Sequence, residues 1–255
     1  DQYTGNVMAR VDKVLNSSET YTYDGLFRLS SFTGKETKNW TLSLLGNWLE
    51  VKKGGQSWDE RDHNGLNEIV SRTFGNNTAS PQYDNSGNTI SLPVDNRDSS
   101  QSFTLCYDAW NRLYKVENER EVLAEYRYDG QGRVIWRKIK TASGDDERDF
   151  YYSTSWQVLS EAQGATTSAN LLSEYFWGAQ YVDEIVGWRK IGDPDEFYTF
   201  LQDANWNVIT LLKKTQDGTQ VAERYRYDPY GEPTFLDADG NTKTTPPIND
   251  RYLFQ

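Results

Sequence analysis

A short turn motif recurs along this chain of 255 residues at nearly constant spacing, and that recurrence constrains the fold more than any other feature. In the clear copies a Tyr precedes an Asp, and Gly or Asn usually stands three residues after the Asp. These copies occupy residues 23–28, 83–88, 107–112, 128–133 and 227–232. Weaker copies at 44–47, 63–67, 153–157 and 202–207, a copy anchored at residue 178 and a partial copy at 2–6 bring the total to eleven. The chain is therefore expected to be a repeat protein.

The anchor position of the motif falls at residues 24, 43, 64, 84, 108, 129, 153, 178, 203 and 228, so the repeat is about 20–25 residues long. Asp at the first position and Gly or Asn at the fourth indicate a type I turn, whose backbone amides hydrogen-bond to the Asp carboxylate. Gly or Asn tolerates the left-handed backbone that a bulged hairpin needs. We expect these Asp residues to act as structural turn anchors: Asp24, Asp84, Asp108, Asp129, Asp203 and Asp228.

The segments between the motifs read as β-strands. Residues 125–128 and 224–227 alternate polar and aromatic side chains, and residues 133–139 are rich in β-branched and aromatic ones. Second turns are expected at residues 54–55, 143–146, 217–218 and 239–241, and the segment 41–52 is interpreted as another hairpin. The predicted fold is all-β: one domain over residues 1–255, built of antiparallel β-hairpin repeats with about twenty short strands in chain order.

Three segments near the C-terminal end, residues 175–184, 201–208 and 225–231, resemble the repeats of RHS/YD-repeat proteins. This resemblance implies a β-strip that curls into a shell or part of one. It also implies a bacterial parent protein, secreted or at the cell surface, whose shell holds a toxin. The chain would be a fragment just upstream of the RHS-associated core. The segment 228–231 is similar to the protease motif of the family, but it lies on the repeat register and is interpreted as a turn.

Charge and composition restrict the partners. The formal net charge is −11, which argues against nucleic acid and anionic membranes, since both need clustered Lys and Arg. No apolar run is long enough for membrane insertion. A basic protein cargo would suit the acidic chain. Open strand edges predict self-association.

Cofactor and metal chemistry have little support. Cys106 is the only cysteine and is expected to be a small hydrophobic residue of a strand. His63 is the only histidine and occupies the Tyr position of its repeat. The chain has no phosphate-binding loop and no spacing typical of a zinc site, so we expect no cofactor and no metal.

An enzyme that uses two carboxylates is the main alternative, most plausibly a glycan-active hydrolase. Asp183 and Glu184 are the candidates, because they follow an aromatic run and lie away from the turn anchors. However, successive residues of a strand point to opposite faces, which disfavours them as a pair. A charged strand or loop edge is the simpler interpretation.

The nine Trp residues suggest a third class, a carbohydrate- or protein-binding module. Trp156 and Trp206 stand three residues after their anchors, which is typical of packing between repeats. Trp40, Trp58 and Trp188 lie off the repeat positions and are the better candidates for a glycan or protein ligand surface. The sequence favours a structural repeat scaffold over both alternatives, because the turn motif accounts for most of its distinctive residues.

Overall fold

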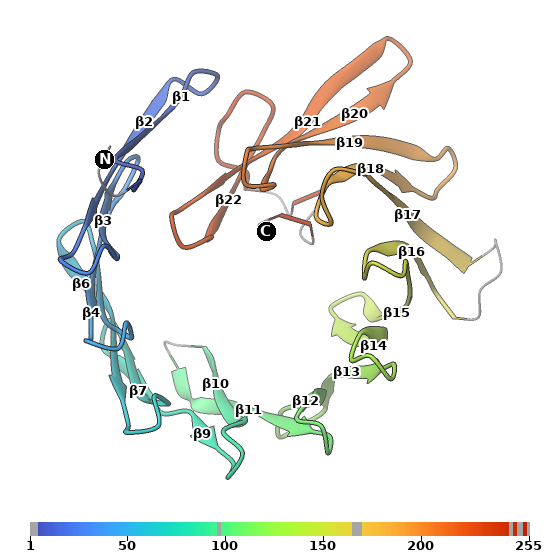
Figure 1. Cartoon of the computed structure of the whole chain (residues 1–255). Coiled ribbons are helices and arrows are strands. Elements are labelled where there is room, and N and C mark those ends of the chain that lie inside the picture. The colour runs from blue at the N-terminus through green and yellow to red at the C-terminus, as the bar shows by residue number, and fades with distance from the viewer. Residues whose placement is uncertain (1–4, 96–97, 165–169, 245–246, 249–251, 254–255) are drawn as a thin grey trace. The chain divides into compact units, whose positions relative to one another are not determined.

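The chain folds into antiparallel β-strands joined by short turns (Figure 1). The computed structural model describes residues 5–95, 98–164, 170–244, 247–248 and 252–253, and no helix occurs among them. The all-β fold of antiparallel hairpin repeats predicted from the sequence is confirmed, and these described residues form 22 strands in two sheets.

In both sheets each strand pairs with its neighbours along the chain, as a continuous series of hairpins requires. The strands of the first sheet are β1 (Ala9–Asp12), β2 (Ser17–Tyr23), β3 (Leu29–Thr33), β4 (Thr37–Leu42), β5 (Trp48–Lys53), β6 (Gln56–His63), β7 (Ile69–Phe74) and β8 (Asn77–Ala79).

The second sheet has 14 strands in the same sequential order. They are β9 (Gln82–Tyr83), β10 (Thr89–Asp95), β11 (Asp98–Tyr107), β12 (Leu113–Glu117), β13 (Val122–Tyr128), β14 (Val134–Thr141), β15 (Gly144–Tyr152), β16 (Val158–Ala162), β17 (Leu171–Trp177), β18 (Ile185–Lys190), β19 (Glu196–Gln202), β20 (Val208–Thr215), β21 (Gly218–Tyr227) and β22 (Pro233–Leu236).

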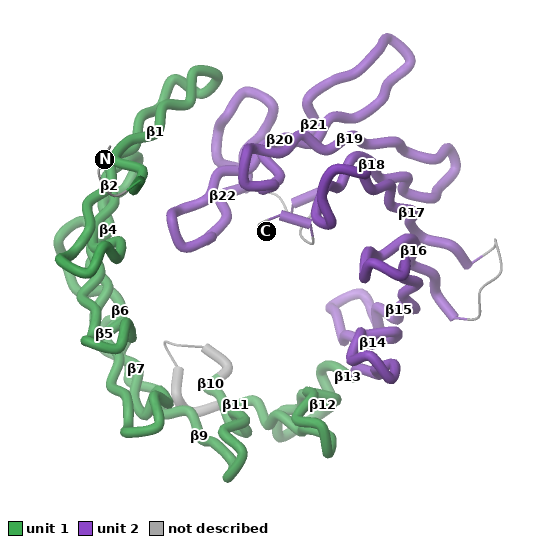
Figure 2. The backbone as a smooth tube through the Cα atoms, viewed as in Figure 1, with its two compact units in different colours: residues 1–125 green, residues 126–255 purple. Residues whose placement is uncertain are grey.

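The chain divides into two compact units, unit 1 with residues 1–125 and unit 2 with residues 126–255 (Figure 2). Each unit has its own hydrophobic core. In unit 1 the core cluster is small and consists of Phe32, Trp40 and Val51. In unit 2 it is larger and mostly aromatic: Tyr175, Ile185, Trp188, Tyr198, Phe200, Val208, Leu211, Tyr225 and Tyr227.

The recurring motif forms one type of turn. At Asp24, the backbone N–H donates to the carbonyl of Arg28 at 2.8 Å, and the Phe27 N–H donates to the carbonyl of Asp24 at 3.0 Å. The Asp24 Oδ1 accepts from the N–H groups of Leu26 and Arg28 at 2.8 and 3.0 Å. The same pattern of bonds to Oδ1 occurs at the other anchors: Asp84, Asp108, Asp129, Asp203 and Asp228.

An Arg that follows the turn ties one turn to the next. The Arg28 Nε donates to Asp24 Oδ2 at 2.7 Å, and its Nη1 donates to the carbonyl of Ser43, in the following turn, at 2.7 Å. Arg133 does the same with Asp129 and with the carbonyl of Ser153. The hydrogen bond from Arg28 lowers the pKa of the Asp24 carboxyl. This Arg was visible in the sequence, but its bond across repeats was not.

The fourth turn position adopts a left-handed backbone whatever residue occupies it. Gly87, Gly132 and Gly231 have φ of 81°, 86° and 87°, but Phe27 and Trp156 have φ of 62° and 69°. Side chains other than Gly, Asn and Asp pay a steric cost in this region. The repeat therefore imposes the turn even where the local residue opposes it.

Replacing Phe27 with Asn is expected to raise the free energy of unfolding by about 0.5–1 kcal/mol, because Asn tolerates a positive φ better. Phe27 is 63% exposed, so little packing is lost. The measurement is urea denaturation followed by Trp fluorescence. Leu26→Asn, at the adjacent exposed position without a positive φ, is the control and should give no gain. An equal gain in both variants would contradict the strain argument.

Two repeats differ from the sequence expectation. At Gly178 the N–H donates to the carbonyl of Glu184 at 2.7 Å, so this copy closes a longer loop than the others. Residues 239–241 were expected to form a simple second turn. Instead, they complete a further copy of the motif, in which Asp237 Oδ1 accepts from Asp239 and Asn241 at 3.0 and 2.8 Å.

Candidate functional site

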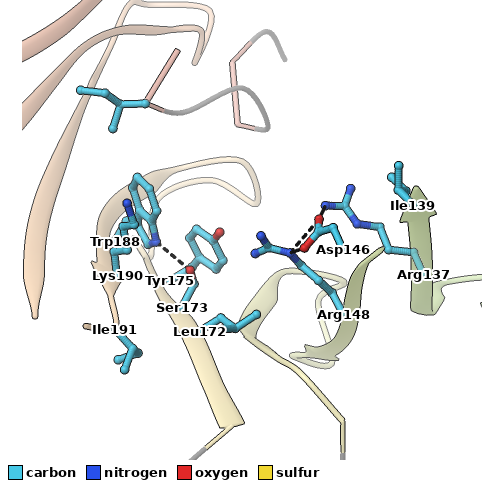
Figure 3. A pocket seen from close by; sticks show the side chains of 11 residues that line it. Arg137, Ile139, Asp146, Arg148, Leu172, Ser173, Tyr175, Trp188, Lys190 and Ile191 are labelled. Carbon is cyan, nitrogen blue, oxygen red and sulfur yellow. Dashed lines mark hydrogen bonds and ion pairs between the residues drawn. The ribbon is translucent and has the colours of Figure 1, made fainter. Parts of the chain in front are cut away.

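A concave site lies in unit 2, on the face of the sheet that carries the aromatic core. It has a volume of about 620 Å³, within the range of small-molecule pockets. Strands β14, β15, β17 and β18 form its walls, and one residue from the C-terminal segment completes it (Figure 3). The lining residues are Arg137, Ile139, Asp146, Arg148, Leu172, Ser173, Tyr175, Trp188, Lys190, Ile191 and Ile248.

One wall of this pocket is charged. Arg137 on β14 lies directly opposite Arg148 on β15 in the sheet register. Both donate to Asp146: Arg137 Nη2 to Oδ2 at 3.1 Å, and Arg148 Nε to Oδ1 at 2.8 Å (Figure 3). Arg148 Nη1 also donates to the fully buried Glu161 at 2.7 Å. Two guanidinium groups are thus held side by side by carboxylates.

Lys190 on β18 supplies a third cation. It lies opposite Ser173 on β17 and opposite Glu196 on β19. Its Nζ is 3.7 Å from Glu196 Oε2, and the side chain is 52% exposed. Glu196 also accepts a hydrogen bond from Lys213, which lowers the pKa of its carboxyl. Because the Lys213 ammonium compensates much of the Glu196 charge, the positive charge of Lys190 is only weakly compensated.

The aromatic wall consists of Tyr175 and Trp188, whose rings stack with centroids 6.3 Å apart. Trp188 Nε1 donates to Ser173 Oγ at 3.1 Å, and the Tyr175 hydroxyl donates to Glu161 Oε1 at 2.8 Å (Figure 3 draws the first). With their polar atoms satisfied, the rings are fixed in place. On its other side Trp188 stacks on Tyr198 at 4.8 Å.

The C-terminal segment of unit 2 packs on the same face. Glu223 on β21 is fully buried, and its carboxylate accepts four hydrogen bonds. They come from the Tyr225 hydroxyl at 2.7 Å, Lys243 Nζ at 2.5 Å, and the Ile248 N–H at 3.1 Å to each oxygen. Further along, the Val208 N–H donates to the Leu253 carbonyl at 2.8 Å. The segment is therefore attached near the pocket by the Glu223 carboxylate, by this backbone hydrogen bond and by the packing of Tyr252 on the rings of Tyr175 and Trp177.

Unit 1 contains a comparable buried charge. Asp59 on β6 is 1% exposed and binds Arg61 Nη2 at 2.5 Å and Arg72 Nη2 at 2.8 Å. Burial alone would raise the pKa of Asp59, but the hydrogen bonds and charges of Arg72 and Arg61 outweigh it, and the pKa lies below its ordinary value. Arg61 also covers the ring of Trp48 at 4.7 Å. This cluster ties β6 to β7 within the sheet.

The three Trp residues expected to contact a ligand lie in different places. Trp40 is 5% exposed and belongs to the unit 1 core, so it presents little ring area. Trp58 is half-buried, with its ring 4.5 Å from that of Phe74. Trp188 is also largely buried, yet it lines the pocket. Ligand binding by these residues stays a prediction, and Trp188 is the member of the three that lines the pocket described above.

Asp183 and Glu184 lie in the long loop that starts at Gly178. Glu184 Oε2 accepts from the Gln180 N–H at 2.8 Å, and the Asp183 carbonyl accepts from Gln202 Nε2 at 2.9 Å. A Cβ at Gly178 would come within 2.0 Å of the Glu184 carboxyl, so a larger residue there would displace the Glu184 side chain. These contacts support a structural function for Glu184, and catalysis by the two carboxylates stays a prediction.

The other chemically reactive residues are at isolated positions. Cys106 is a free thiol on β11, half-buried and 4.0 Å from Glu117 Oε1. His63 ends β6 and pairs with Ile69 in the register. Among the residues that the structure describes, no group of His, Cys, Asp and Glu is suited to hold a metal, and no helix is long and apolar enough to cross a membrane.

Hairpins in unbroken chain order, joined by one type of Asp-anchored turn, define this chain as a β-hairpin repeat protein. The family model of the teneurin YD-shell matches residues 5–242, nearly the whole chain, and the chain belongs to this family. The resemblance to RHS/YD-repeat proteins is thereby confirmed.

Solved structures with similar folds are toxin-complex proteins. The crystal structure of TcdB2-TccC3 without its hypervariable C-terminal region has a TM-score of 0.50 at 9% identity, over 87% of this chain and 15% of that chain. A TcdB2-TccC3-TEV structure has a TM-score of 0.42 at 14% identity, over 91% and 13%. A Tc holotoxin pore of Photorhabdus luminescens has a TM-score of 0.35 at 12% identity, over 86% and 15%.

At 9% identity, the similarity to the TcdB2-TccC3 structure without its hypervariable C-terminal region shows the fold alone. This chain spans about 15% of the length of the first of these structures. The comparison with curated protein sequences found no match.

Proposed function

We propose that this chain is a structural segment of a YD-type shell that encloses or displays a partner protein, in a secreted or cell-surface parent. The observation that carries the proposal is the family match over residues 5–242 on an uninterrupted series of hairpins. A repeat array of this kind buries its core by stacking neighbouring units, and it extends by adding more of them. Its function is to present a surface of large area.

The charge of the chain favours a basic partner. Asp and Glu number 38 against 27 Lys and Arg, so the surface is acidic and would attract a cationic protein at low ionic strength. A glycan-active hydrolase and a carbohydrate-binding module are not favoured. Asp183 and Glu184 make loop contacts, and Trp40 is in the core.

A scaffold segment should also associate through its edges. β1 is the terminal strand of the first sheet and pairs only with β2 among the described strands. Its Val11 is 67% exposed, and the strand carries a single Lys or Arg, Arg10. Lys on an edge strand is a common device against strand addition, so Val11→Lys should oppose it.

Sedimentation velocity tests this proposal. We expect concentration-dependent association of the chain, and Val11→Lys should weaken it by about threefold to fivefold. Val14→Lys makes the same charge change in the exposed turn after β1, away from the strand, and should not weaken the association.

In the same runs, cytochrome c serves as a basic probe protein and an acidic haem protein as its control. Selective, salt-sensitive cosedimentation of cytochrome c supports a basic cargo. If the chain stays monomeric at all concentrations and cytochrome c does not cosediment with it, the scaffold proposal is contradicted.

A further inference from the structure

The pocket in unit 2 has properties that a purely structural segment does not need. We propose that it binds a small anionic ligand with a flat apolar body. A carboxylate or sulfonate of the ligand would lie near Arg137, Arg148 and Lys190, and its body would lie against the aliphatic side chains of the lining and the exposed edge of Trp188 (Figure 3). This inference concerns a binding site, and it does not depend on the shell function proposed above.

The first argument is the charge of the lining. It contains three cations and one carboxylate, Asp146, in a chain whose net charge is −11. Behind the lining, Glu161 binds Arg148 at 2.7 Å and Glu196 lies 3.7 Å from Lys190. Because Glu196 also binds Lys213, four cations face three carboxylates across this part of the sheet. The local excess is positive, and it is concentrated at the half-exposed Lys190.

The second argument is the geometry of the guanidinium groups. Arg137 and Arg148 are held by Asp146 at 3.1 and 2.8 Å, on two strands in register. They are thus fixed before a ligand arrives, so binding costs little side-chain entropy. Guanidinium groups donate in a planar fork that matches the oxygens of an anion. An arrangement of this kind is suited to one compact anionic group.

The third argument is the rest of the wall. Tyr175 and Trp188 are 6% and 9% exposed and border the pocket, and four aliphatic side chains line the rest of it: Ile139, Leu172, Ile191 and Ile248. A cavity of about 620 Å³ accommodates a molecule of small-ligand size and not a folded protein. The combination of cations with apolar walls selects an amphipathic anion over a simple inorganic one.

Anilinonaphthalene sulfonate is a suitable probe, because it combines one sulfonate with a flat apolar body and fluoresces when it leaves water. We expect saturable binding to the whole chain. Lys190→Glu should weaken it by about tenfold, since the reversal replaces an attraction with a repulsion at a partly desolvated position. Lys190→Gln, which keeps the length of the side chain without its charge, should weaken it by about threefold.

Lys138→Glu is the matched control. Lys138 adjoins Arg137 on β14, so its side chain points to the opposite face of the sheet. The Lys138→Glu substitution should therefore change the affinity by less than about twofold. Phenylnaphthylamine, which lacks the sulfonate, should bind more weakly and respond to neither substitution. Circular dichroism melting confirms that the variants are folded. Absence of saturable binding, equal effects of Lys190→Glu and Lys138→Glu, or equal behaviour of the neutral probe would overturn the proposal.

Discussion

Asp59→Asn is expected to lower the free energy of unfolding by about 3–5 kcal/mol, because it removes one partner of a buried ion cluster. Asp59 is 1% exposed, while the Arg61 and Arg72 side chains that bind it are 18% and 29% exposed. The neutral amide would leave two guanidinium groups without their shared counter-charge in a desolvated place. The core of unit 1 is small, so little else is available to compensate.

Urea denaturation with fluorescence detection measures this loss, and amide hydrogen exchange in β5, β6 and β7 localises it. Asp62→Asn is the control on the same strand. Asp62 is exposed and accepts one hydrogen bond, from Ser71 Oγ at 3.0 Å, so its replacement should cost less than about 1 kcal/mol. If the two variants lose similar amounts of stability, burial of the Asp59 charge is not the cause of the loss.

The same cluster determines a pH dependence. The pKa of Asp59 lies below its ordinary value in the folded protein, so its ion pairs contribute stability above the unfolded pKa of about 3.9. That contribution is lost as the pH falls through the lower, folded pKa. The difference in stability between the original chain and Asp59→Asn should therefore be full at pH 7 and shrink in acid. A difference that is constant down to acid pH would contradict the ionised state of Asp59.

The second large effect is expected at Glu223. Glu223→Ala should destabilise unit 2 by about 3–5 kcal/mol and release the C-terminal segment, because Lys243 Nζ would stay buried without its carboxylate. The Lys243 side chain is only 11% exposed in the intact chain. Trypsin cleavage after Lys243 is the direct measurement, and it should become faster in the variant. Glu119→Ala, in an exposed turn, is the control.

A double-mutant cycle separates charge from attachment. Glu223→Gln keeps an oxygen for the Ile248 N–H but leaves the Lys243 ammonium uncompensated. Adding Lys243→Met removes that ammonium, so the double variant should recover at least about 1 kcal/mol relative to Glu223→Gln. Additive losses would mean that the two groups do not interact. Hydrogen exchange of the Ile248 amide reports on the segment in both cases.

The repeat explains why much of the fold was predictable. The anchors Asp24, Asp108 and Asp129 bind the amides of their own turns, and a turn of this kind needs only residues adjacent in sequence. Because the hairpins follow one another along the chain, each strand is expected to pair with the strand next to it in sequence. The exceptions are local: Gly178 starts a longer loop, and Asp237 anchors a turn that the sequence pattern did not reveal.

The amino-acid sequence by itself determined the strand order, the turn type and the class of protein, because all three follow from contacts within one or two repeats. Only the tertiary structure decided which side chains meet across strands. Arg137 lies opposite Arg148 and Tyr175 opposite Trp188 because of the strand register, and Lys243 reaches Glu223 from the segment after β22. Burial also placed Trp40 in a core instead of on a surface. Such placements depend on the exact strand register and on the segment after β22, and the turn motif specifies neither.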